Sequence, residues 1–187
     1  MGGMNDDREQ LVDELLVMDA QDGSTRAMDR LVGRWQKRLW RYACRLTGSG
    51  EAAWEVTQEA WVGIIRGLSR LNDPARFRPW AYRIVTNKAN DWLARNVKSR
   101  TPAEPAHDRR DSAESVEIDA RLDLEEALPR LSAPSRAVLT LHYLEDFALA
   151  EVARVLHVPR GTVKSRLHAA RDELRSLLTE PEEEIRR

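Results

Sequence analysis

Hydrophobic residues recur every three or four positions along most of the chain, which is the spacing of one face of an α-helix. In the first half this pattern predicts helices over about residues 10–20, 26–46, 51–71 and 79–97. Turns rich in Gly, Ser, Asn and Pro separate them, and Ser24 or Thr25 is expected to cap the second helix. Strand-like alternation of apolar and polar residues is nearly absent, so we expect an all-α fold.

In the second half the same pattern predicts four shorter helices, over about residues 120–128, 134–144, 149–156 and 160–178, with Ser132 as a cap of the second. Residues 100–119 differ, because they are rich in Pro, Ala and charge and carry almost no large apolar side chain. We therefore expect two small helical domains, 10–99 and 120–178, joined by a flexible acidic linker at 100–119. Residues 1–9 are expected to be disordered, and residues 179–187 to form an acidic tail.

The helix expected over residues 51–71 carries two apolar stripes. One consists of Val56, Ala60, Ile64 and Leu68, and the other of Trp54, Gln58, Trp61 and Ile65. If the first stripe faces the core, the second leaves large apolar groups near solvent, with Glu55 and Glu59 beside them. Such a surface indicates docking of a partner. A helix buried on two sides is the alternative.

The next helix, over about residues 79–97, separates its apolar and polar positions. Its apolar stripe consists of Ala81, Ile84, Val85, Ala89 and Trp92. Its opposite side carries Arg83, Thr86, Asn87 and Asn90. That side offers both donors and acceptors, as reading base edges or extruded bases requires.

The helices over residues 149–156 and 160–178, with the turn His157-Val158-Pro159 between them, are typical of a helix-turn-helix. Such a turn holds the second helix at a steep angle, so that its N-terminal end can enter the major groove of DNA. The outward residues of this second helix are Arg160, Thr162, Lys164, Ser165, Arg166, His168 and Arg171. Arg can bind guanine with two hydrogen bonds, and Lys, Ser and Thr can hold phosphates or base edges. An ordinary helical hairpin with a basic exterior is the alternative.

Charge adds to this interpretation only through its distribution, because the formal net charge is −1. Residues 83–100 contain five basic residues and one acid, and residues 160–175 contain five basic residues and two acids. Two separate basic segments fit a protein that contacts phosphate at two places. Two solvated helix faces would give the same pattern.

Several classes of protein are disfavoured. Cys44 is the single cysteine, so neither a disulfide within the chain nor a cysteine cluster for zinc is expected. The four histidines lack metal-ligand spacing to carboxylates, and no Gly-rich phosphate loop or nucleophile elbow occurs, so we expect no metal, no cofactor and no enzyme activity. The first ten residues are polar, and no apolar run approaches the roughly 20 residues that span a bilayer, so we expect a cytoplasmic protein without membrane insertion.

Four motifs carry a resemblance to a known family. Two of them lie in the second half: GTVKSRL at 161–167, followed by Ala170-Arg171, and LPRL at 128–131, followed by RAVL at 136–139. The other two lie in the first half: VTQEAW at 56–61 and RPWAYRIVTN at 78–87. In this order and spacing they resemble the extracytoplasmic-function sigma factors of the sigma-70 superfamily. The resemblance extends from about Thr25 to Leu178, interrupted by the linker.

The resemblance implies an alternative sigma factor, which binds core RNA polymerase and directs promoter recognition, melting and transcription initiation. It implies that a first domain (region 2) binds the clamp helices of the largest polymerase subunit through Glu55, Gln58, Glu59 and Trp61. It also implies contacts of the same domain with the minus-ten promoter element through Trp80, Arg83, Asn87, Lys88 and Asn90. The second domain (region 4) would place residues 160–171 in the major groove of the minus-thirty-five element, near the polymerase flap. Many members are restrained by an anti-sigma factor, and the acidic linker would thread the RNA channel of the polymerase.

The sequence departs from the family pattern at four positions. Trp54 stands where an acid is usual, and Glu55 where Asp is usual. Ala148 replaces a Ser or Thr cap, at a cost of about 1 kcal/mol to that helix start. His157 replaces a turn glycine, and His tolerates a left-handed conformation better than most residues, at some cost. The rival function is a stand-alone helix-turn-helix regulator that binds duplex DNA, but such a protein would not need the Gln58-Glu59 docking helix.

Overall fold

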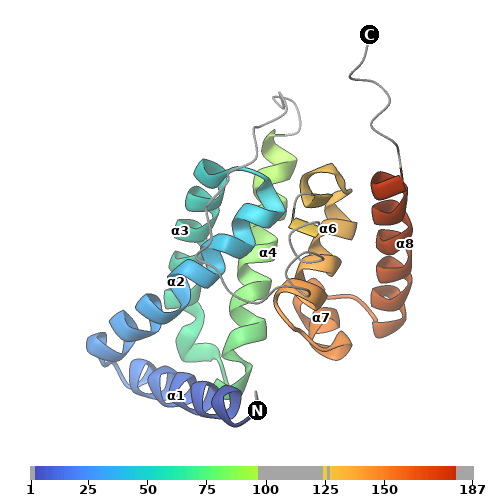
Figure 1. Ribbon diagram of the computed structural model, residues 1–187. Helices are drawn as coiled ribbons and strands as arrows, with labels where there is room; N and C mark the ends of the chain where they lie inside the picture. Colours follow the sequence, from blue (N-terminus) through green and yellow to red (C-terminus); the bar gives the residue numbers. More distant parts are fainter. Residues whose placement is uncertain (1–2, 97–123, 126, 180–187) are drawn as a thin grey trace. The chain divides into compact units, whose positions relative to one another are not determined.

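The computed structural model describes residues 3–96, 124–125 and 127–179, and all of its regular elements are helical (Figure 1). The all-α prediction is therefore confirmed for these residues. The chain divides into two compact units, Met1–Thr101 and Pro102–Arg187, which are described separately. The predicted linker at 100–119, most of the helix predicted over 120–128 and the tail from residue 180 onward lie outside the described residues.

The described part of the N-terminal unit is a bundle of α1 (Gly3–Gln21), α2 (Thr25–Thr47), α3 (Gly50–Gly67) and α4 (Phe77–Asn96). Two 3-10 turns, Leu68–Arg70 and Pro74–Arg76, connect α3 to α4. Helices α2, α3 and α4 pack against one another, and α1 lies across α2 and these turns at one end of the bundle (Figure 1).

Helix α1 begins at Gly3, so the prediction that residues 1–9 are disordered is wrong for residues 3–9. Acids near the N-terminus of a helix interact favourably with its macrodipole, and Asp7 occupies such a position. Side-chain contacts support the same turns, because Arg38 of α2 pairs with Glu9 at 3.1 Å. Local charge therefore stabilises helical turns on the N-terminal side of residue 10, where the apolar periodicity begins.

Short polar side chains fix where the helices of this unit begin. The hydroxyl of Ser24 accepts a hydrogen bond from the Ala27 amide, as the sequence predicted, and Ser49 caps α3 in the same way through Ala52. Each cap satisfies an amide that has no partner within its helix. Gly48 ends α2 with a φ of 73°, a conformation that glycine adopts without strain.

Aromatic rings from α2 and α4 fill the centre of the N-terminal unit. The ring of Trp35 meets Phe77 and Tyr82 edge-on, with centroids 5.5 Å and 6.4 Å apart. The Tyr42 hydroxyl lies 2.8 Å from the Thr86 hydroxyl, and the latter also donates to the Tyr82 carbonyl. Thr86 is therefore buried, and its assignment to the polar side of α4 was wrong, because α4 packs against both α2 and α3.

The described part of the C-terminal unit contains α6 (Ala133–Leu139), α7 (Leu149–Leu156) and α8 (Arg160–Thr179). A 3-10 turn at Leu128–Arg130 precedes α6. The helix predicted over 134–144 is continuous in the structure, but its last part, Thr140–Leu144, has π-helical hydrogen bonding. Val138, Leu141, Phe147, Val152 and Val163 are buried between these helices.

A carboxylate of α8 secures the start of α6. Glu173 accepts hydrogen bonds from the amide and the hydroxyl of Ser132. Ser132 occupies the N-cap position of α6, as predicted, but its hydroxyl bonds Glu173 and the Ser135 hydroxyl and caps no backbone amide of the helix. Burial raises the pKa of Glu173, but hydrogen bonds from Ser135 and Ser132 and the charge of Arg136 outweigh it, so the pKa is lower than usual.

Candidate functional site

Helices α7 and α8 form the predicted helix-turn-helix. His157 ends α7 with a φ of 54° and a ψ of 46°, the left-handed conformation expected where the family has glycine. The Val158 amide then donates to the Ala153 carbonyl at 3.0 Å, and the Val163 amide donates to the Pro159 carbonyl at 3.1 Å. The first bond holds the turn on the end of α7, and the second closes the first turn of α8.

The surface of α8 divides as the sequence predicted. Val163, Leu167 and Ala170 are buried. On the other side, Arg160, Lys164, Ser165, His168 and Arg171 are exposed, and we call these five residues the α8 basic face. Thr162 and Arg166, which were predicted with them, are half-buried. The α8 basic face therefore presents mostly cations and donors to solvent, which is what contact with phosphates and base edges requires.

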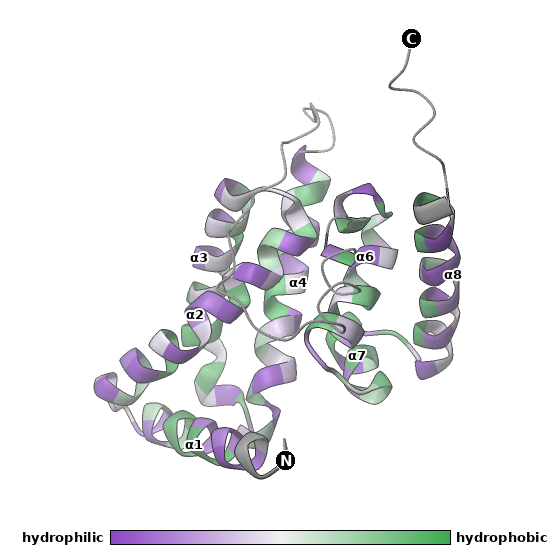
Figure 2. Ribbon diagram, viewed as in Figure 1, coloured by the Kyte–Doolittle hydropathy of each residue, from purple (hydrophilic) through white to green (hydrophobic). Residues whose placement is uncertain are grey.

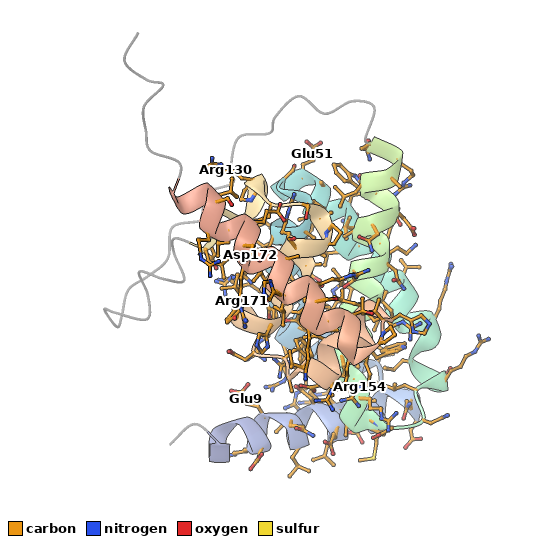
Figure 3. The ribbon with its side chains drawn as sticks, turned by 90° about the vertical axis from the view of Figure 1, so that its right-hand side faces the viewer. Glu9, Glu51, Arg130, Arg154, Arg171 and Asp172 are labelled. Atoms are coloured by element: carbon orange, nitrogen blue, oxygen red, sulfur yellow. The ribbon has the colours of Figure 1, made fainter. Side chains whose placement is uncertain are left out.

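Three members of the α8 basic face have partners within the unit: Ser165, which donates to the Thr162 carbonyl at 3.0 Å, His168 and Arg171. His168 Nδ1 lies 2.8 Å from Asp172, which also binds Arg175 at 2.8 Å. Figure 3 shows Arg171 and Asp172 at neighbouring positions along α8. Asp172 is thus occupied by Arg175 and the His168 imidazole of its own helix. One of the two acids in this basic segment is therefore partly neutralised.

Arg171 has a partner that the sequence analysis missed. Its Nε and Nη2 atoms donate to the Tyr143 hydroxyl at 2.9 Å and 2.6 Å, and its guanidinium lies 5.7 Å from the centroid of the Tyr143 ring. Tyr143 lies 28 residues earlier in the chain, within the π-helical turn. No local spacing in the sequence links the two positions, because the fold of the unit brings them together.

The exposed stripe of α3 differs in one residue from the prediction. Trp54 and Ile65 are each 51% exposed, and Val62 and Gln58 are exposed between them. Trp61, which was predicted in this stripe, is only 7% exposed. The reason is that α3 packs against both α2 and α4, so its buried side is wider than a single stripe. We call Trp54, Gln58, Val62 and Ile65 the α3 stripe.

Acids of α3 face bases of α4. Glu59 lies 3.2 Å from Lys88 and 3.6 Å from Arg95, and Glu55 lies 3.9 Å from Arg95 and accepts a hydrogen bond from Trp92 at 3.1 Å. We call Glu55, Glu59, Lys88 and Arg95 the α3–α4 charge cluster. The hydrogen bond from Lys88, with the charges of Lys88 and Arg95, lowers the pKa of Glu59 against a smaller effect of burial. Glu59 therefore carries a full charge at neutral pH.

The remaining candidates on α4 lie at helical spacing. Arg83, Asn87 and Asn90 are exposed, and Trp80 precedes them on the same side but is half-buried. A methyl group at Gly67 would come within 3.0 Å of the Trp80 ring, so this glycine is what lets the indole pack against the end of α3. Lys88 faces α3 and not this side. The structure thus brings four of the five predicted residues onto one side of α4.

Within the described residues, no three His, Cys, Asp or Glu side chains gather closely enough to hold a metal ion. Among these residues, too, no helix combines the length and the apolar composition that a membrane crossing needs.

Comparison with known proteins places these features in a family. The Sigma-70 region 2 model matches residues 31–99, and the Sigma-70 region 4 model matches residues 121–174. The chain is 34% identical over 157 residues to the ECF RNA polymerase sigma factor SigE of Mycolicibacterium smegmatis, covering 80% of the chain and 61% of that relative. It is 32% identical over 178 residues to the ECF RNA polymerase sigma-E factor of Escherichia coli K12, covering 88% of the chain and 93% of that relative.

A solved structure has a similar fold. CnrH, solved in complex with the cytosolic domain of CnrY, superposes with a TM-score of 0.66 at 26% identity, and the match covers 89% of this chain and 97% of CnrH. A match over 89% of the chain includes parts of both units.

Proposed function

Because the chain belongs to the extracytoplasmic-function sigma factors, we propose that its two surfaces bind core RNA polymerase and promoter DNA. The protein is an alternative sigma factor that directs transcription initiation. One observation carries the assignment of surfaces: a single chain combines an exposed apolar and acidic helix side in region 2 with the α8 basic face in region 4. A DNA-binding regulator that acts alone would need only the second.

The polymerase would dock on α3. Glu55, Gln58 and Glu59 supply charge and hydrogen bonds, while Trp54, Val62 and Ile65 supply apolar area that is otherwise left in water. The clamp helices of the largest polymerase subunit are the expected partner. Trp61 would act from within the core, because its burial leaves it little surface for a direct contact.

The minus-ten element would bind the side of α4 that carries Trp80, Arg83, Asn87 and Asn90. The amides can donate to and accept from base edges, Arg83 can hold a phosphate, and an indole that is half-exposed can stack on an unpaired base. Lys88 can contribute only if its ion pair with Glu59 opens.

The α8 basic face, together with Thr162 and Arg166, would bind the minus-thirty-five element in the major groove, with the flap of the polymerase nearby. Contacts of this kind are individually modest, and polymerase would make the two DNA contacts simultaneous, so that the second binding event is intramolecular. We assign region 2 to residues 10–99, region 4 to 120–178 and a connecting linker to 100–119. Phosphoryl transfer belongs to the polymerase, and we assign no catalytic residue to this chain.

The protein would work in the cytoplasm, where polymerase and DNA lie. An anti-sigma factor is a further expected partner, as in many members of the family. CnrH, held by the cytosolic domain of CnrY, is a similar chain in complex with a second protein.

Run-off transcription tests the proposal. Purified core polymerase is given a library of promoter-like DNA with wild-type protein, with Gln58→Ala/Ile65→Ser, or with Arg160→Ala/Lys164→Ala. We expect transcripts that depend on the protein and share a two-part upstream motif, and loss of transcripts with either variant. Retention of DNA binding by the free protein, without any binding to core polymerase, would instead establish a stand-alone helix-turn-helix regulator.

A further inference from the structure

Helix α1 exposes an apolar stripe on the side that faces away from its own bundle. Leu11, Leu15 and Met18 are 56%, 48% and 43% exposed and lie at i, i+4 and i+7. Figure 2 shows hydrophobic positions along α1 interleaved with hydrophilic ones. Leu16 and Val17, on the other side, are buried. The helix is thus apolar on two opposite sides, and a helix of this kind is normally buried on both.

The stripe sits on a fixed scaffold. Asp13, on the inner side of α1, forms an ion pair with Arg34 of α2 at 2.7 Å. At the end of α1, Gln21 donates from Nε2 to the carbonyls of Leu68 and Leu71, both at 2.8 Å. These contacts hold α1 alongside the stripe and beyond its C-terminal end. A partner would therefore meet a preformed surface and would spend little free energy on ordering it.

Charged side chains of α1 on this outer side and its edges are mostly acidic. Asp7, Glu14 and Asp19 lie within one helical turn of the stripe, against Arg8 as the one base on that side. An apolar strip between acids is complementary to an amphipathic helix whose apolar side is edged by Lys and Arg.

The acids beside the α1 stripe disfavour binding of another segment of this chain, or of a second copy of it, on the stripe. Residues 104–126 contain nine acids and three bases, and the tail at 180–184 is also acidic, so both would be repelled. Two copies of α1 joined by a twofold axis would place acid against acid. We propose that the outer side of α1 binds a basic amphipathic helix of a regulatory partner protein, independently of the surfaces assigned to polymerase and DNA.

Designed helical peptides test the proposal on the full-length protein. One peptide of about 18 residues, or roughly five helical turns, carries a Leu stripe edged by Lys, and a matched peptide carries Glu at each Lys position. Nuclear magnetic resonance of isotope-labelled protein and fluorescence anisotropy report the site and the affinity. We expect binding of the Lys peptide, with shifts confined to α1, and at least tenfold weaker binding of the Glu peptide.

Two variants and a control locate the determinants. Leu11→Ser/Leu15→Ser should weaken the Lys peptide by about tenfold or more, because exposed apolar area is lost without a change of fold. Asp7→Lys/Asp19→Lys should reverse the preference between the peptides. The control Val62→Ser/Ile65→Ser, on the α3 stripe, should leave peptide binding unchanged. Run-off transcription by Leu11→Ser/Leu15→Ser should equal that of wild type, which separates this proposal from the proposed function.

Each opposite result overturns the proposal. No detectable binding of the Lys peptide, equal binding of both peptides, or shifts centred outside α1 would reject the surface. Sedimentation that shows a dimer abolished by Leu11→Ser/Leu15→Ser would reject the partner, because a second copy of the chain would then be the occupant.

Discussion

In the N-terminal unit the candidate contact charges face one another, since Lys88 lies 3.2 Å from Glu59 and Arg95 lies between Glu59 and Glu55. On the α8 basic face, Arg160 and Lys164 are exposed and make no ion pair within the described part of the chain. Lys88 and Arg95 must therefore leave existing pairs before they meet a ligand, whereas Arg83 is exposed and makes no ion pair within the described residues. Arg160 and Lys164 can likewise bind phosphate at once.

This difference has a consequence for promoter binding by the free protein. Exposed ion pairs contribute about 0–1 kcal/mol each, so the α3–α4 charge cluster imposes a small but real penalty on contacts made by Lys88. A partner that neutralises Glu55 and Glu59 would remove that penalty. Polymerase docking on α3 and DNA binding on α4 would then assist each other, whereas the α8 basic face would respond to DNA alone.

The largest effect on DNA affinity is expected from substitutions in the α8 basic face. Arg160→Ala/Lys164→Ala should weaken promoter binding by the polymerase complex about 10- to 100-fold, because each contact to a base or phosphate contributes about 1 kcal/mol or more. Affinity for duplex promoter DNA at several salt concentrations measures the change, and the salt dependence should become shallower. Arg154→Ala, which removes a base of α7 (Figure 3), is the control. An equal loss from Arg154→Ala would show that the α8 basic face has no special role.

The next effect concerns stability within the C-terminal unit. Glu173→Gln should destabilise that unit by about 1–2 kcal/mol, because charge-assisted hydrogen bonds to Ser132 are weakened. All six tryptophans lie in the N-terminal unit, so tryptophan fluorescence follows one unit while circular dichroism follows both. We expect the circular-dichroism transition to shift and the fluorescence transition to remain. A shift of both would mean that the units unfold together.

The lowered pKa of Glu173 also determines how the destabilisation by Glu173→Gln depends on pH. A carboxylate with a depressed pKa in the folded state stabilises it fully above the pKa of the unfolded chain, and the stabilisation is lost as the pH falls through the folded value. Glu173→Gln should therefore cost most near neutral pH and little in acid.

The sequence predicted the parts of these surfaces that depend on local spacing. The helix-turn-helix, the left-handed His157 and the Ser24 cap each follow from a few neighbouring residues, and all are confirmed. The same is true of the buried stripe Val56, Ala60 and Ile64. The fold class followed because helical periodicity is a property of the chain itself.

Features that depend on packing between helices were missed or wrong. Trp61 and Thr86 were placed on outer sides, but both are buried, because α3 and α4 each contact two neighbours and a stripe cannot show how wide the buried side is. The pairing of Tyr143 with Arg171 and that of Glu173 with Ser132 join positions 28 and 41 residues apart. Only the tertiary fold brings such residues together.

A smaller effect on DNA affinity is expected from a substitution in the α3–α4 charge cluster. Glu59→Gln should raise the affinity of the free protein for single-stranded DNA about two- to fivefold at low salt, because Lys88 and Arg95 lose an opposing charge. It should also lower the free energy of unfolding of the N-terminal unit by less than about 1 kcal/mol. Glu51→Gln changes the net charge equally without touching α4, so any gain it shows is a general charge effect. An equal gain from both variants would remove the distinction between the two surfaces.

The smallest effect concerns the one cation of the α8 basic face that is held by an aromatic neighbour. Tyr143→Phe keeps the ring 5.7 Å from Arg171 but removes the hydroxyl that accepts from Nε and Nη2. The guanidinium then loses a fixed direction, so duplex affinity should fall about two- to fivefold, the equivalent of one neutral hydrogen bond. Tyr143→Phe should have no further effect in the Arg171→Ala background, because the hydroxyl acts through Arg171. A full additive loss in the double variant would mean that Tyr143 contacts DNA itself, and the α8 basic face would then extend onto the π-helical turn.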